Sequence, residues 1–120
     1  MAIHVKRIYD KLSEEDGSRV LVDRLWPRGL KKEDAHIDLW LKEIAPSTEL
    51  RKWFDHDPHK WEEFRKRYFS ELKNNSETIT RLLHEMNKGE LTLLFSARNA
   101  EFNNAVALKE YLESITTQGK

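Results

Sequence analysis

The sequence predicts an α/β protein, a small sheet flanked by helices in a single compact domain. Two short β-branched or apolar runs come early, at residues 3–9 and 19–25, and a third lies at residues 91–95. Between and after them, apolar residues recur every three or four positions, which is typical of amphipathic helices. A chain of 120 residues can bury one core but is too short for two. We therefore expect one domain over residues 1–120.

The first two predicted strands are separated by a polar stretch that contains Asp16-Gly17, a strong turn signal. This spacing permits a hairpin, whereas parallel pairing of neighbouring strands needs a longer crossover. The stretch could equally carry the second strand to a position that is not adjacent to the first, so the pairing stays open. The third run, 91–95, is almost unbroken in apolar residues and predicts a strand buried on both faces.

The helical segments are predicted from their caps as well as their periodicity. Ser47 or Thr48 caps a helix over 49–54, and Asp57-Pro58 is a typical helix start. In the helix that follows Pro58, the residues on the apolar face are Trp61, Phe64, Tyr68 and Leu72. A further helix is predicted over 77–88, and a last one after a cap at Asn103 or Asn104. Residues 37–44 match both periodicities, with four helical matches against three strand matches, which favours a short helix.

Composition excludes several classes of protein. The 21 basic residues balance the 21 acidic ones, which argues against a polyelectrolyte as the general partner. The absence of cysteine excludes disulfides, thiol nucleophiles and thiolate metal sites. No apolar run has the length of a membrane span, and the first residues lack a signal-peptide core. We expect a cytoplasmic protein with no membrane partner.

Chemistry-bearing side chains gather where the second predicted strand ends. Asp23, Arg24, Trp26 and Arg28 lie just before the chain turns at Gly29. We interpret them as a site in which arginines hold an anion and Asp23 orients them or acts as a base, so that Asp23, Arg24 and Arg28 are the predicted catalytic residues. The alternative is a structural network in which Asp23 pairs with an arginine and Trp26 fills the core.

A second group follows the strand at 91–95. Ligands bind open α/β sheets where a strand leads into a helix, because the helix N-terminus offers free N–H groups. Around these two strand ends, the predicted ligand-binding side chains are Arg7, Tyr9, Trp26, Ser96, Arg98, Asn103 and Asn104. The alternative is that an asparagine only caps the helix and Arg98 is a surface charge. The loop lacks the glycines of a dinucleotide fingerprint, and His56-Asp57-Pro58-His59 fits no metal-ligand spacing, so no cofactor and no metal are predicted.

Several strings carry a family resemblance. The string D-R-L-W-P-R-G at 23–29, together with residues 6–10, 40–47, 49–54 and 103–105, resembles the YeaO-like branch of a domain-of-unknown-function family of uncharacterised bacterial proteins. The resemblance implies a small cytoplasmic single-domain α/β fold without an established activity. The residues that match its hallmark strings are Arg7, Tyr9, Asp10, Asp23, Arg24, Trp26, Pro27, Arg28, Gly29, Pro46, Ser47, Asn103 and Asn104. Some relatives carry a cysteine near the strand-end loop, where this chain has Ser96-Ala97, so a thiol mechanism would not transfer.

The functional hypothesis that follows is a site for an anionic or nucleotide-like small molecule. Arg7, Arg24, Arg28 and Arg98 would hold the anion, and Trp26 would stack on the ligand. If the protein is an enzyme, hydrolysis of a phosphorylated or glycosidic metabolite is the reaction to test first. The alternatives are a non-catalytic module that binds nucleic acid or protein through Trp61–Tyr68, although interleaved glutamates disfavour nucleic acid, and a homodimer formed through apolar helix faces rather than a monomer.

Overall fold

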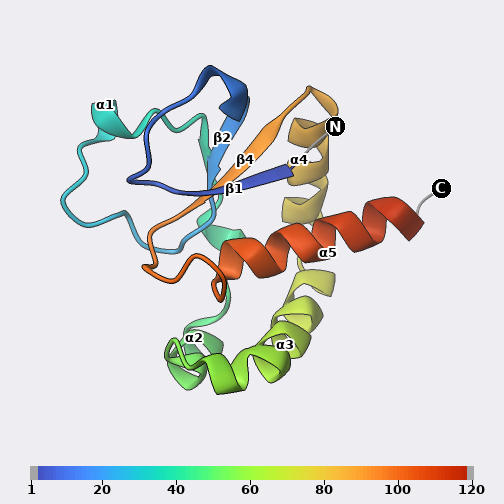
Figure 1. Cartoon of the computed structure of the whole chain (residues 1–120). Coiled ribbons are helices and arrows are strands. Elements are labelled where there is room, and N and C mark those ends of the chain that lie inside the picture. Colours follow the sequence, from blue (N-terminus) through green and yellow to red (C-terminus); the bar gives the residue numbers. More distant parts are fainter. Residues whose placement is uncertain (1–2, 119–120) are drawn as a thin grey trace.

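The four strands form a single parallel sheet. The computed structural model of the chain describes residues 3–118, and the strand order in the sheet is β1-β4-β2-β3 (Figure 1). The strands are β1 (Ile3–Arg7), β2 (Ser18–Leu21), β3 (Leu39–Trp40) and β4 (Leu91–Phe95). Leu93 of β4 is paired with Val5 on one side and Val20 on the other. The α/β fold class expected from the sequence is confirmed.

β4, the last strand in the sequence, lies between β1 and β2, so these two strands do not form a hairpin. The hairpin alternative is wrong, and the excursion to a non-adjacent position is what the chain makes. Because both strands are parallel to β4, residues 8–17 must carry the chain back to the amino end of the sheet. The return ends at Gly17, whose φ is +65° and where an added Cβ would lie 2.2 Å from the carbonyl oxygen of Glu90. Only glycine fits this position without displacing the backbone.

The helices begin close to the predicted caps. They are α1 (Lys32–Ala35), α2 (Thr48–Phe54), α3 (Trp61–Lys73), α4 (Ser76–Asn87) and α5 (Asn104–Gln118), with short 3-10 turns η1 (Glu14–Asp16), η2 (Lys42–Ile44) and η3 (Pro58–Lys60). Ser47 Oγ accepts the N–H of Leu50 at 3.1 Å, and Asn103 Oδ1 accepts the N–H of Val106 at 3.0 Å. Both side chains satisfy helix N–H groups that would otherwise lack an acceptor.

Two element predictions need correction. Residues 37–44 do not form a helix, because Leu39 and Trp40 pair with Val20 and Leu21 of β2 and only residues 42–44 coil into a 3-10 turn. Pairing with a buried strand outweighs a local helical periodicity. The first two strands also end earlier than predicted: β1 ends at Arg7, and β2 ends at Leu21. These early ends release the following residues into the loops above the sheet.

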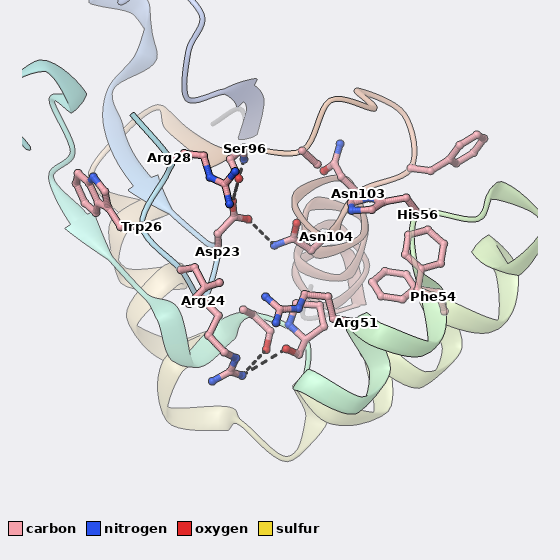
Figure 2. Close-up of a pocket in the computed structure, with 16 residues that line it drawn as sticks. Asp23, Arg24, Trp26, Arg28, Arg51, Phe54, His56, Ser96, Asn103 and Asn104 are labelled. Atoms are coloured by element: carbon pink, nitrogen blue, oxygen red, sulfur yellow. Dashed lines mark hydrogen bonds between the residues drawn. The ribbon is translucent and has the colours of Figure 1, made fainter. Parts of the chain in front are cut away.

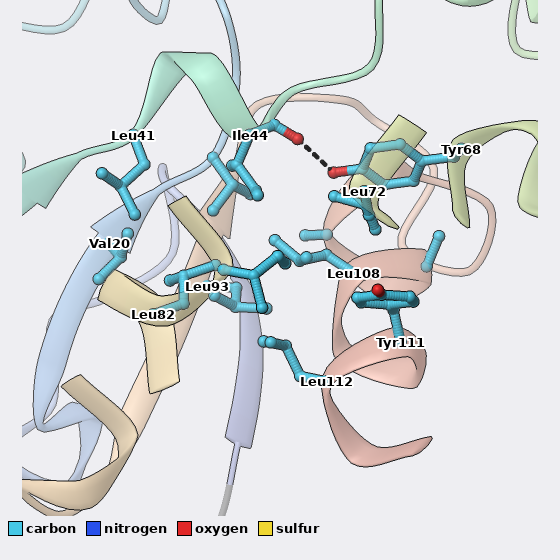
Figure 3. Close-up of a cluster of buried hydrophobic side chains, with 14 of the residues drawn as sticks. Val20, Leu41, Ile44, Tyr68, Leu72, Leu82, Leu93, Leu108, Tyr111 and Leu112 are labelled. Atoms are coloured by element: carbon cyan, nitrogen blue, oxygen red, sulfur yellow. Dashed lines mark hydrogen bonds between the residues drawn. The ribbon is translucent and has the colours of Figure 1, made fainter. Parts of the chain in front are cut away.

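The sheet packs its two faces differently. Alternate residues of the central strands point toward the helices, where Val20 and Leu93 meet Leu82 of α4 and Leu108 of α5 in the main core (Figure 3). The predicted apolar face of α3 joins this core, with Phe64, Tyr68 and Leu72 all buried. The helix layer therefore supplies most of the buried apolar surface.

The opposite face is covered by the loops at 8–17 and 22–38, which Figure 1 shows in blue and cyan beside α1 and away from α3. A small apolar cluster around Leu21 and Leu94 lies near the carboxyl ends of the strands. Toward the amino ends, the same face holds a buried ion pair between Arg19 and Asp16, and Lys6 Nζ also contacts Asp16 at 3.0 Å. These loops are therefore held by polar contacts as well as apolar ones.

Candidate functional site

A cavity of about 350 Å³ opens at the carboxyl ends of β2 and β4 (Figure 2). Its lining comes from the loop after β2, the segment that leads into α2, α2 with the turn after it, Phe64 of α3, and the loop between β4 and α5. We call it the strand-end pocket. The carboxyl ends of parallel strands meet at one edge of a sheet, and the loops that leave them surround the crevice in which α/β proteins bind ligands. The volume is at the lower end of the range for small-molecule sites.

Asp23 ties two of these loops together. Its Oδ2 accepts the backbone N–H and the hydroxyl of Ser96, each at 2.8 Å, and its Oδ1 accepts Nδ2 of Asn104 at 3.2 Å (Figure 2). A carboxylate offers about four acceptor positions, so three of them are occupied by the protein. Within residues 3–118 Asp23 forms no ion pair with Arg24 or Arg28, so the alternative of a structural Asp–Arg network is absent from that part of the chain.

Arg24 is held only loosely. Its Nη2 donates to the carbonyl oxygens of Ala45 and Pro46 at 3.3 and 3.4 Å, both long for such bonds. Its Nε is buried and has no acceptor among the residues that the structure describes. A buried donor without an acceptor costs about 1–3 kcal/mol. An acceptor brought into the pocket by a ligand would relieve that cost.

Arg28 and Arg51 add two guanidinium groups that are exposed to solvent. Neither side chain forms an ion pair or a hydrogen bond within residues 3–118. Figure 2 shows Arg28 beside Ser96 and Asp23, and Arg51 projecting from α2 on the side of Arg24. With three arginines and one carboxylate among its described lining residues, the pocket carries excess positive charge.

Arg51 and His56 were not among the predicted site residues. Both line the pocket, and both come from α2 and the turn after it, a segment whose helical pattern shows no site signal. The string at 49–54 that carries the family resemblance does contain Arg51, and it was the one signal that could have pointed to it. His56 has a positive φ of 57°, in the left-handed region that histidine adopts more readily than most residues.

Three predicted ligand residues, Arg7, Tyr9 and Arg98, are not brought into the strand-end pocket. Arg7 Nε donates to the carbonyl of Ala97 at 3.0 Å, and its guanidinium lies 4.8 Å from the centre of the Tyr9 ring. The hydroxyl of Tyr9 donates to the carbonyl of Arg28 at 2.8 Å. Arg7 and Tyr9 therefore support the backbone of two pocket loops from outside, while Arg98 is exposed.

The other predicted residues line the pocket but differ in which of their polar side-chain atoms already have a hydrogen-bond partner. Trp26 donates Nε1 to the carbonyl of Leu30 at 2.7 Å and packs edge-on against Trp40 at 5.4 Å. Asn103 uses its oxygen as the α5 cap and its Nδ2 on the carbonyl of Asn99. Asn104 donates Nδ2 to the carbonyl of Val22 at 3.0 Å and to Asp23, which leaves its Oδ1 without a donor among the described residues.

A buried tyrosine supports the segment that leads into α2. The Tyr68 hydroxyl donates to the carbonyl of Ile44 at 2.7 Å (Figure 3), directly before the lining residues Ala45 and Pro46. Burial raises the pKa of Tyr68 well above its usual value, and the nearby charges of Glu71 and Asp23 act in the same direction. The hydroxyl therefore stays protonated and keeps donating to Ile44.

The arrangement contains no evident metal centre within residues 3–118, where no three histidine, aspartate or glutamate side chains gather as a metal-binding group. None of the described helices has the length and apolarity needed to cross a membrane.

Fold and pocket together define the class: a parallel α/β domain with a cationic, ligand-sized pocket where its central strands end. The family described as "Inactive DUF488-N3 subclade" matches residues 2–120, and the chain belongs to this family. The expected membership in a YeaO-like family of uncharacterised proteins is confirmed by this match and by the relatives below.

The chain is 47% identical to the uncharacterized protein YeaO of Escherichia coli K12 over 115 residues, which are 96% of this chain and the whole of that protein. It is 36% identical over 110 residues to the uncharacterized protein Rv3073c of Mycobacterium tuberculosis H37Rv and to the uncharacterized protein Mb3100c of Mycobacterium bovis, with 92% of each chain covered. No solved structure is similar enough to count as a match.

Proposed function

We propose that this protein binds a small anionic molecule in the strand-end pocket and does not transform it. The observation that carries the proposal is that Arg24, Arg28 and Arg51 face one cavity without forming an ion pair within the described chain. Elsewhere the arginines of α3 are paired, Arg65 with Glu62 and Glu110 and Arg67 with Glu63. A guanidinium fork matches the oxygens of phosphate and carboxylate groups.

The hydrogen bonds of Asp23 favour binding over hydrolysis. Asp23 is the one carboxylate among the described lining residues, and three of its acceptor positions are filled. Glycoside hydrolysis ordinarily needs two carboxylates that flank the bond. The word "inactive" in the family's description agrees with binding without turnover.

The alternative interface through Trp61–Tyr68 has less support. Tyr68 and Phe64 are buried in the main core, and Trp61 packs against Phe102 with ring centres 5.4 Å apart. These rings are therefore occupied within the protein and offer little surface on which a base could stack.

The test is thermal unfolding in sodium phosphate against sodium chloride at equal ionic strength, which separates a bound anion from general screening. At a phosphate concentration 100 times Kd, the wild-type protein should gain about 2.7 kcal/mol of stability. Arg28→Ala and Arg51→Ala should each lose most of this gain. The matched control is Arg81→Ala, which removes an exposed arginine outside the strand-end pocket and should keep the gain.

Two results would overturn the proposal. One is a phosphate effect that is no larger than the chloride effect, or that survives in both pocket variants. The other is release of inorganic phosphate from phenyl phosphate by the wild-type protein but not by Asp23→Asn, because that result would make the pocket catalytic.

A further inference from the structure

The apolar part of the strand-end pocket is largely aromatic. Eight of the sixteen described lining residues are apolar, and four of these eight carry aromatic rings. The four are Trp26, Phe54, Phe64 and Phe102. A ligand that fills this cavity must therefore present an apolar, ring-sized portion as well as a charge.

Phe54, Phe64 and Phe102 belong to one aromatic cluster. Phe54 stacks on Phe64 with ring centres 4.3 Å apart, and Trp61 links Phe64 at 5.6 Å to Phe102 at 5.4 Å. Phe54 and Phe64 are buried, whereas Phe102 is only half-buried. Among these three lining phenylalanines, Phe102 thus has the most surface left for a ligand.

The position of Phe102 is set by the loop itself. Asn99 Oδ1 accepts the N–H of Glu101 at 2.8 Å and the N–H of Phe102 at 3.0 Å, which closes a turn directly before α5. Trp26 packs on Trp40 as Phe102 packs on Trp61, with ring centres 5.4 Å apart in both pairs, and it also donates its Nε1 to Leu30. The Phe102 side of the pocket holds three of the four lining aromatic rings, so we place the stacking role there rather than at Trp26.

We infer that the ligand is an aromatic phosphate: a phosphoryl group among the three arginines, and an aromatic ring against Phe102 and Phe54. This inference rests on the proposed function and names its ligand class. The three guanidinium groups offer many N–H donors, and the buried Nε of Arg24 has no acceptor among the described residues. A phosphoryl group presents three acceptor oxygens and a carboxylate only two, so a phosphoryl group matches this set of donors better. Aromatic rings prefer to pack edge-to-face or offset on other rings, which favours an aromatic over an aliphatic body.

The experiment is isothermal titration of the full chain with three probes: inorganic phosphate, phenyl phosphate and cyclohexyl phosphate. Phenyl phosphate should bind about tenfold more tightly than inorganic phosphate, and more tightly than cyclohexyl phosphate. In Phe102→Leu this advantage should fall to about twofold, with the affinity for inorganic phosphate unchanged. Unchanged phosphate affinity also shows that the variant is folded.

The control variant is Phe69→Leu. Phe69 is likewise half-buried but packs against Tyr111 at 5.4 Å, outside the pocket, so its replacement should leave the advantage of phenyl phosphate intact. The inference is overturned, with the proposed function still standing, if inorganic phosphate binds and phenyl phosphate binds no better, or if Phe102→Leu keeps the full advantage. If none of the three probes binds, both the proposed function and this inference are wrong.

Discussion

Arg19 and the arginines of the strand-end pocket put the same side chain to opposite uses. The side chain of Arg19 is 6% exposed, and each of its nitrogens has an acceptor: Nε the carbonyl of His36, Nη2 the carbonyl of Ala35, and Nη1 the carboxylate of Asp16. Arg28 and Arg51 have no side-chain partner in the described chain. The difference shows that Arg19 supports the fold, while Arg28 and Arg51 could bind a ligand without losing a contact within the described chain.

Proximity to an aspartate in the sequence does not decide between the two uses. Asp23 is the immediate neighbour of Arg24, yet its oxygens face Ser96 and Asn104. Asp16 is three residues from Arg19 and meets it directly, because the turn η1 folds the carboxylate back onto the sheet. Both residues lie in the loop after β2, where Asp23 contacts Ser96 and Asn104 and Arg24 contacts the carbonyls of Ala45 and Pro46.

The largest effect is expected for Arg19→Met. Removing the guanidinium leaves the carbonyls of Ala35 and His36 without this donor and leaves Asp16 with Lys6 and the N–H of Ser13. Breaking a buried ion pair costs about 3–5 kcal/mol. Urea unfolding followed by circular dichroism measures this loss. Arg81→Met is the exposed control and should stay within about 0.5 kcal/mol of the wild type. A loss below about 1 kcal/mol for Arg19→Met would remove the distinction between the two groups of arginines.

Acid should weaken the same network. Burial by itself would raise the pKa of Asp16, but Lys6, the backbone N–H of Ser13 and Arg19 together hold it below its usual value. The stabilisation is therefore complete above the unfolded-state pKa of about 3.9 and is lost as the pH falls through the lower folded-state pKa. Free energies of unfolding measured between pH 6 and pH 2 should drop less steeply in Asp16→Asn. Asp34→Asn, at an exposed carboxylate, should keep the wild-type slope, and an equal slope in all three proteins would contradict the prediction.

Arg24→Met should have an intermediate effect on stability, about 0.5–1.5 kcal/mol. The variant loses two long hydrogen bonds to Ala45 and Pro46 but also removes a buried donor that lacks an acceptor. Urea unfolding in the absence of phosphate gives the value. A loss as large as that of Arg19→Met would place Arg24 among the structural arginines.

The smallest effect on stability is expected for Arg28→Ala and Arg51→Ala, within about 0.5 kcal/mol of the wild type without added anions. Both side chains are exposed and have no partner among the residues that the structure describes, so their removal leaves no buried group there unsatisfied. Thermal unfolding in low-phosphate buffer checks this. A marked destabilisation of either variant would mean that its guanidinium supports the fold.

Seven of the sixteen described lining residues were named from the strand ends, because parallel strands deliver their following residues to one edge. They are Asp23, Arg24, Trp26, Arg28, Ser96, Asn103 and Asn104, and their roles in binding or catalysis stay predictions. The hallmark string at 23–29 contains the two arginines.

The rest could not be predicted because it depends on packing between distant segments. Arg51 and His56 lie at the pocket because α2 packs on α3 through Phe54 and Phe64, and the ring of Phe102 packs on Trp61 of α3. Arg7 and Tyr9 lie outside it because they support the backbones of Ala97 and Arg28.

By itself, the sequence determined the local features of this protein: the buried strand at Leu91–Phe95, the apolar face of α3, and the caps at Asp57, at Ser47 or Thr48, and at Asn103 or Asn104. Each depends on side-chain spacing and on hydrogen bonds between residues close in the chain. Only the tertiary structure decided that β4 enters between β1 and β2, and that residues 39–40 join the sheet rather than a helix. The tertiary structure also decided which arginines have acceptors. A guanidinium donates to the carboxylates and carbonyls that lie around it in space, and the packing of the whole domain sets where these acceptors lie.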